Sequence, residues 1–155
     1  MSLYVQAEVI IQLLIAAFLA TLIGWDRENR GQPAGLRTHI LVAVGSCLFT
    51  ALSEHAFSGD TGRVAAQVVV GIGFLGAGTI IQRKGQANHL TTAASIWATA
   101  AVGMAVGVGA WFLALGATLI IWAVLVIVRS FSKVEPKSPP SSPIREGGGD
   151  NNQSP

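Results

Sequence analysis

The sequence predicts an all-α protein that crosses a lipid bilayer as one bundle of about five transmembrane helices. Hydrophobic residues make up 51% of its 155 positions and charged residues only 12%, whereas soluble domains carry about 25% charged residues. The charges fall in clusters that separate five long apolar runs. Each run is close to the roughly 20 residues that a helix needs to cross a bilayer core, so we expect each to form one span.

The five expected helices follow one another with short connections. They are Val5–Gly24, Arg37–His55, Arg63–Gln82, Leu90–Val108 and Ala110–Val128. The last two are expected to be joined by a tight turn at Gly107–Gly109. Pro, Ser and Gly dominate the end of the chain, so we divide it into a transmembrane domain, residues 1–130, and a disordered cytoplasmic tail, residues 131–155.

The third run contains the string Gly71-Ile-Gly-Phe-Leu-Gly, which matches the dinucleotide-binding pattern G-x-G-x-x-G. A dinucleotide site also needs an acidic residue about 20 positions later to hold the ribose. The first acid after Asp60 is Glu135, so the sequence excludes a nucleotide cofactor here. Small residues in a membrane helix let neighbouring backbones approach closely, and we expect them to place the third helix in the middle of the bundle. The predicted packing residues are Ala66, Gly71, Gly73, Gly76, Ala77 and Gly78.

The distribution of cations predicts the orientation in the membrane. If the N-terminus is outside, nine of the ten Lys and Arg residues lie on the cytoplasmic side and only Arg63 lies outside. Cytoplasmic loops of membrane proteins carry an excess of Lys and Arg. We therefore predict an external N-terminus and a cytoplasmic C-terminus, which requires an odd number of spans.

Polar residues within the spans have two readings. Thr92, Ser95 and Thr99 form one stripe on the fourth helix, and Gln67 lies on the Gly71 face of the third. They either form hydrogen bonds between helices or line a passage for an ion. We favour the first reading, because no carboxylate lies in mid-membrane, where ion pathways usually have one. Glu8, Glu54, His55 and Asp60 on the outer side could gather a divalent cation, since carboxylates suit magnesium. We expect them to be solvated charges instead, because their spacing resembles no dedicated metal loop, and no metal or cofactor site is predicted.

The connection between the first two helices carries unusual charges. Asp26 ends a helix and Arg37 begins one, and the helix dipole disfavours each charge at that position. We expect the two to pair across the short loop, with Arg30, one turn after Asp26, as the local competitor. His39, one turn into the second helix, is expected to be a hydrogen-bonding interface residue. Arg27 adds to the positive charge of this loop.

Five short motifs resemble the MgtC/SapB family of bacterial membrane proteins over roughly residues 5–128. They are Gly24-Trp-Asp-Arg-Glu, Ala34-Gly-Leu-Arg-Thr, Gly62-Arg-Val-Ala-Ala-Gln, Gly71-Ile-Gly-Phe-Leu-Gly-Ala-Gly and Leu90-Thr-Thr-Ala-Ala-Ser-Ile-Trp-Ala. The resemblance implies a small protein of the bacterial inner membrane, linked to growth at low magnesium and, in pathogens, to survival inside host cells. Many members carry a soluble domain after the last helix, where this chain has its Pro-rich tail.

These observations predict a regulatory membrane protein without enzymatic activity, and magnesium or other ion transport is the alternative. The expected partners are lipid and other membrane proteins or a second copy of this chain. Mg²⁺ is a further candidate, and nucleic acid is not expected. The candidate functional residues are Asp26, Arg27, Arg30, Arg37, Thr38, Gln67, Thr92, Ser95 and Thr99.

Overall fold

The computed structural model describes residues 1–56, 61–83 and 86–128. Side chains are described for these residues except at positions 61, 81–88 and 128. Its helices are α1 (Leu3–Asn29), α2 (Leu36–His55), α3 (Thr61–Thr79), α4 (Leu90–Gly107) and α5 (Trp111–Ala123), which continues as the π-helical turn η1 (Val124–Val128). A short antiparallel hairpin of β1 (Ile81–Arg83) and β2 (Gln86–Asn88) joins α3 to α4. The predicted tail, residues 131–155, lies outside the described residues, as do Asp60 and Arg129.

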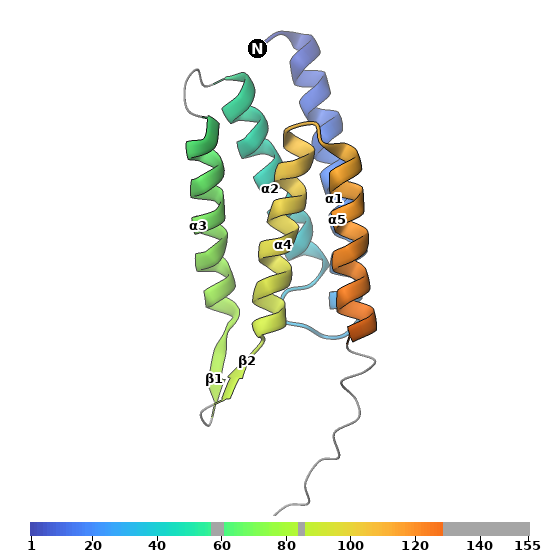
Figure 1. The fold of residues 1–155 in the computed structure, drawn as a ribbon, viewed down its shortest axis with the longest axis vertical. Coiled ribbons are helices and arrows are strands. Elements are labelled where there is room, and N and C mark those ends of the chain that lie inside the picture. The colour runs from blue at the N-terminus through green and yellow to red at the C-terminus, as the bar shows by residue number, and fades with distance from the viewer. Residues whose placement is uncertain (57–60, 84–85, 129–155) are drawn as a thin grey trace, which may run out of the picture.

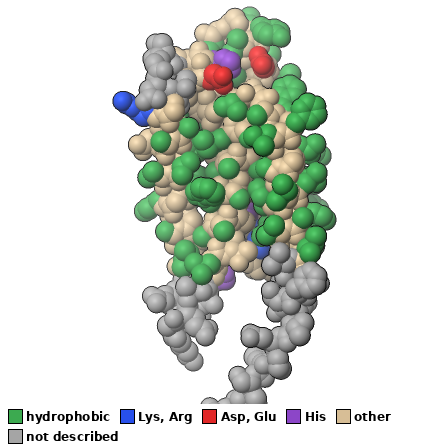
Figure 2. All heavy atoms as spheres, in the orientation of Figure 1, with side chains coloured by type: hydrophobic (Ala, Val, Ile, Leu, Met, Phe, Trp, Pro, Cys, Tyr) green, Lys and Arg blue, Asp and Glu red, His purple; other side chains and the backbone are tan. Residues whose placement is uncertain are grey.

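Successive helices run in alternating directions along one long axis (Figure 1). Helices α1, α2, α3 and α4 are long and apolar enough to cross a membrane, and Trp111–Ile127 is a shorter apolar helix. Hydrophobic side chains cover the sides of the bundle, while the acidic side chains seen in Figure 2 lie near the end at which α1 begins. The prediction of an all-α, multi-pass membrane protein is confirmed.

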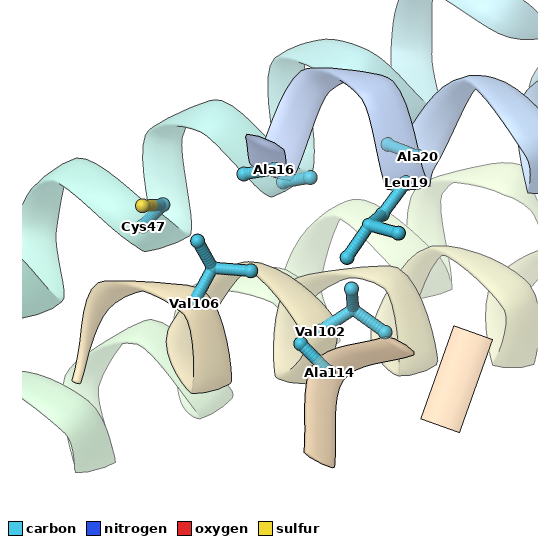
Figure 3. Packing of buried hydrophobic residues seen from close by; sticks show 8 residues of the cluster. Ala16, Leu19, Ala20, Cys47, Val102, Val106 and Ala114 are labelled. Atoms are coloured by element: carbon cyan, nitrogen blue, oxygen red, sulfur yellow. The ribbon is translucent and has the colours of Figure 1, made fainter. Parts of the chain in front are cut away.

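Helix α4 lies at the centre of the bundle, because it packs against each of the other four helices. The core around it consists of small and medium-sized side chains from α1, α2, α4 and α5 (Figure 3). Ala16 and Ala20 of α1 are fully buried, as are Cys47 of α2 and Val106 of α4. Small side chains bring the helix backbones close together, which compensates for the absence of a hydrophobic driving force inside a bilayer.

The prediction that the third helix lies in the middle of the bundle is wrong. Helix α3 lies at the edge of the bundle and packs mainly on α2 and α4. A Cβ atom added to Gly71, Gly73 or Gly78 would meet nothing within 4 Å. Among the predicted packing residues only Gly76 faces a neighbour closely, with Ala93 Cβ 3.5 Å from the added atom, whereas Ala66 and Ala77 are exposed.

The glycines that do allow close helix contact lie elsewhere. A Cβ atom on Gly103 of α4 would collide with the carbonyl oxygen of Ala43 in α2, and one on Gly107 would lie 2.7 Å from the carbonyl oxygen of Cys47. Glycines four residues apart on one face form the G-x-x-x-G pattern of close helix pairs. On α1, a Cβ atom at Gly24 would lie 2.9 Å from the Cα of Leu36 in α2. These contacts hold α1, α2 and α4 together.

The first prediction compares Gly103→Ala with Gly73→Ala. The added methyl group at position 103 forces α2 and α4 apart, and such overpacking costs about 1–3 kcal/mol. At position 73 it enters open space and leaves the fold unchanged. We expect a lower thermal unfolding midpoint for Gly103→Ala alone, measured on detergent-purified protein. Equal loss in both variants would contradict this helix arrangement.

Candidate functional site

Three segments of the chain meet at the basic end of the bundle, by which we mean the end where α1 finishes and α2 and α4 begin. Arg27 of α1 is only 4% exposed there. Its Nη2 atom donates hydrogen bonds to Gln32 Oε1 and to Thr92 Oγ1, each at 3.1 Å. The Thr92 hydroxyl in turn donates to Gln32 Oε1 at 3.3 Å. Arg27, Gln32 and Thr92 thus form a closed hydrogen-bonded triangle between the α1–α2 loop and α4.

The backbone of the loop explains why Gln32 reaches Arg27. Gly31 has a φ of 60°, a conformation that glycine adopts at little cost. The amide of Gly31 donates to the carbonyl of Glu28 at 2.9 Å, and the amide of Gln32 donates to the carbonyl of Arg27 at 3.1 Å. This pair of bonds is the Schellman motif that ends many helices. It turns the chain back over the last turn of α1 and places Gln32 beside the guanidinium group.

His39 connects α2 to α4 next to this triangle. Its ring is fully buried, with Nδ1 2.8 Å from the carbonyl oxygen of Gly35 and Nε2 3.1 Å from Ser95 Oγ. The expectation that His39 is a hydrogen-bonding interface residue is confirmed. Ser95 and Thr99 also donate to the backbone carbonyls of Thr92 and Ser95, each at 2.8 Å, so the stripe on α4 is buried and hydrogen-bonded.

Glu28 caps the start of α2, a role that the sequence analysis did not assign. Its Oε2 atom accepts a hydrogen bond from the amide of Leu36 at 2.8 Å. A carboxylate is favourable at a helix N-terminus, where backbone amides are unsatisfied and the dipole is positive. A Cβ atom on Gly35 would collide with this carboxylate. The glycine is therefore required for the cap, and Glu28 in the first family motif depends on Gly35 in the second.

The predicted pair between Asp26 and Arg37 is wrong. Asp26 pairs with Arg30, whose Nε donates to Asp26 Oδ1 at 2.7 Å, while Arg37 is exposed. Residues four apart on a helix face each other without any loop adjustment. The local competitor therefore prevails, and Arg30 neutralises Asp26 at the C-terminal end of α1.

Gln67 and Thr38 lie in a different place, in an open groove of about 640 Å³ between α2 and α3. Most other residues of this groove are apolar, and they include Leu41, Phe49 and Leu75. Gln67 is exposed, whereas Thr92 and Thr99 are completely buried and do not line the groove. The candidate residues therefore form two separate sites.

Within the described part of the chain, no group of three or more His, Cys, Asp and Glu side chains is arranged to hold a metal ion. Glu54 and His55 are exposed at the opposite end from Arg27, and Glu8 is half-buried on the first turns of α1. Asp60, the fourth residue considered on that side, lies outside the described residues.

The model of the MgtC family matches residues 13–134. The chain belongs to the MgtC family. No solved structure matches it.

Several curated proteins are similar to this chain. A protein of Escherichia coli K12 named "Putative magnesium transporter YhiD" is 44% identical over 135 residues, which cover 81% of this chain and 63% of the relative. Protein MgtC of Salmonella typhimurium LT2 is 43% identical over 120 residues, covering 77% and 52%. Protein MgtC of Brucella abortus is 46% identical over 121 residues, covering 77% and 50%. The chain thus spans about half to two thirds of the length of these relatives.

In this MgtC-family chain, three of the five motifs meet at the basic end. The first supplies Arg27 and Glu28, the second supplies Gly35, and the fifth supplies Thr92 and Ser95. Gln32 and Glu28 were missed because their partners are a distant threonine and a backbone amide. The pairing of Glu28 with a glycine seven residues later was the available signal, since glycine permits a close approach.

The second prediction tests the triangle with Thr92→Val, which removes the hydroxyl at constant shape. Arg27 then loses an acceptor in a buried place, which costs about 1–3 kcal/mol. Thr118→Val is the matched control, because Thr118 is equally buried and its hydroxyl bonds only the carbonyl of Ala114 in its own helix. We expect Thr92→Val to lower the unfolding midpoint clearly more than Thr118→Val. Similar losses would show that the triangle adds no stability.

Proposed function

We propose that this protein is a non-enzymatic regulator of the bacterial inner membrane, which acts in adaptation to low magnesium by contacting other membrane proteins through α3. The relationship to proteins named MgtC and to a relative named for magnesium transport supports the physiological context. The exposure of α3 supports contact with a partner, and this observation carries the proposal.

Helix α3 is long and apolar enough to cross the membrane, but little of it is buried against the rest of the chain. Only 11% of its membrane-spanning window is buried, against 50% for α4 and 44% for α2. Two of the five family motifs nevertheless lie on α3. Small side chains lower the distance at which a second helix can pack, so the open Gly71 position, which lines the groove between α2 and α3, suits a helix from another protein.

Gln67 gives this surface a polar anchor. The amide is exposed within a helix expected to lie in the bilayer, and it makes no hydrogen bond within the described residues. An amide without a partner in an apolar medium costs several kcal/mol. A partner helix that carries a hydrogen-bonding side chain relieves this cost and selects for one orientation in the groove between α2 and α3.

The proposed orientation places the N-terminus of α1 outside and the basic end in the cytoplasm. Arg27, Arg30 and Arg37 all belong to the basic end, and an excess of Arg and Lys is typical of the cytoplasmic side. The third prediction is that a cytoplasmic reporter fused after Val128 is active and a periplasmic reporter at that position is silent. The reverse result would show that the protein has the opposite orientation in the membrane.

Magnesium transport is the competing function, because the name of the Escherichia coli relative describes that protein as a putative magnesium transporter. The observation against it is the separation of Gln67 from the buried Thr92 and Thr99, since a pathway needs polar groups along one continuous route. The proposal predicts no magnesium flux above that of empty liposomes for the purified protein. Flux that depends on Gln67 would favour the transporter.

The fourth prediction is a photo-crosslinking experiment in cells grown at low magnesium. A photoreactive residue at Val70 of α3 is expected to capture a membrane protein, whereas the same residue at Leu14 of α1 is not. The two positions are matched, because Val70 is 67% exposed and Leu14 66%.

Gly71→Leu completes this test. We expect the variant to fold normally, since position 71 is open and lines the groove, to lose the crosslink from Val70 and to fail to support growth at low magnesium. Full growth with an intact fold would contradict a role for this surface.

A further inference from the structure

The contacts of His39 fix the position of one proton. Nδ1 lies 2.8 Å from the carbonyl oxygen of Gly35, and a carbonyl oxygen can only accept a hydrogen bond. Nδ1 therefore carries a hydrogen in either protonation state. The state of the ring is decided at Nε2, which faces Ser95 Oγ at 3.1 Å.

Ser95 has only one hydrogen to donate, and two acceptors compete for it. Its Oγ lies 2.8 Å from the carbonyl oxygen of Thr92, which again can only accept. If the hydroxyl donates there, Ser95 can only accept from Nε2, and Nε2 must then carry a hydrogen as well. All three contacts are satisfied together only when His39 is doubly protonated.

The neutral ring satisfies one contact fewer. With a bare Nε2, the Ser95 hydroxyl bonds either the ring or the carbonyl of Thr92. We propose that His39 and Ser95 form a proton-operated joint between α2 and α4, in which the second proton on the ring decides which acceptor the Ser95 hydroxyl binds. The carbonyl it binds or releases belongs to Thr92, whose own hydroxyl holds Arg27.

The charged groups around the joint are few among the described residues. Arg27 of α1 is part of the same network, and Glu28 is engaged with the amide of Leu36. On α2 itself Arg37 is exposed, and α4 carries no charged side chain. The charged residue of α3 is Arg63, in its first turn. The opposite end of α3, its last turn, leads into the hairpin near the basic end. Arg63 therefore lies at the end of α3 away from the joint. Loss or gain of the second proton therefore acts on the hydrogen bonds of Ser95 and through Thr92 on Arg27.

The test is the pH dependence of the thermal unfolding midpoint in detergent, between roughly pH 5 and pH 8, where histidines titrate. Because the chain has two further histidines, His55 and His89, the relevant quantity is the part of the pH dependence that His39→Gln removes. All three contacts form only with the doubly protonated ring, so the contribution of His39 to the unfolding midpoint is expected at the acidic end of this range and to be lost as the pH rises. One hydrogen bond to a charged group predicts that this contribution is roughly 3–8 °C. Ser95→Ala should remove the same part, and the double variant should remove no more. Thr99→Ala, which removes a hydroxyl that donates to the backbone carbonyl of Ser95 and leaves the Ser95 hydroxyl in place, should retain it.

Ser95→Ala that keeps the full pH dependence, or His39→Gln that removes none, would overturn the joint. If the variants do not fold, ¹⁵N spectra of the ring nitrogens in the native protein decide the question. We expect Nδ1 to stay protonated throughout and Nε2 to change from protonated to bare across the same pH range. A ring that keeps one protonation state over this range would also overturn the proposal.

Discussion

The structure depends on one constraint, the burial of the Arg27 guanidinium at the basic end of the bundle. A buried charge is tolerated only when its donors find acceptors, and here Gln32 and Thr92 accept from it. These bonds tie the end of α1 and the α1–α2 loop to the start of α4. The close contacts at Gly24 and Gly103 continue this packing along the helices, because glycine leaves room there for the backbone of α2.

The sequence predicted the helices well, because apolar runs bounded by charges leave little choice inside a bilayer. It also predicted the buried stripe of Thr92, Ser95 and Thr99. The sequence did not predict which residues contact each other. Glycines on α3 indicate close approach without saying to what, and within this chain Gly103 of α4 makes the close approach instead. Asp26 paired with Arg30 because a neighbour on the same helix competes more effectively than a residue across a loop.

The division of the bundle into two parts connects fold and function. Helices α1, α2, α4 and α5 share a core of small side chains, whereas α3 leaves most of its surface uncovered. A regulator that works by helix contact needs such a surface on a firm support. Thr38 of the groove and His39 of the joint are adjacent in α2, so this helix contributes to both the basic end and the proposed contact surface.

The most direct test of this account measures distances between spin labels in lipid nanodiscs by double electron–electron resonance, in a variant with Cys47 replaced by Ser. One label pair, at Asn29 and Thr91, joins the exposed ends of α1 and α4, and a second, at Arg37 and Ala77, joins α2 to α3. The account predicts a narrow distance distribution for the first pair, which Thr92→Val broadens more than it broadens that of the second pair. A broad first distribution, or a first distribution that Thr92→Val leaves unchanged, would contradict the view that Arg27 fixes the bundle.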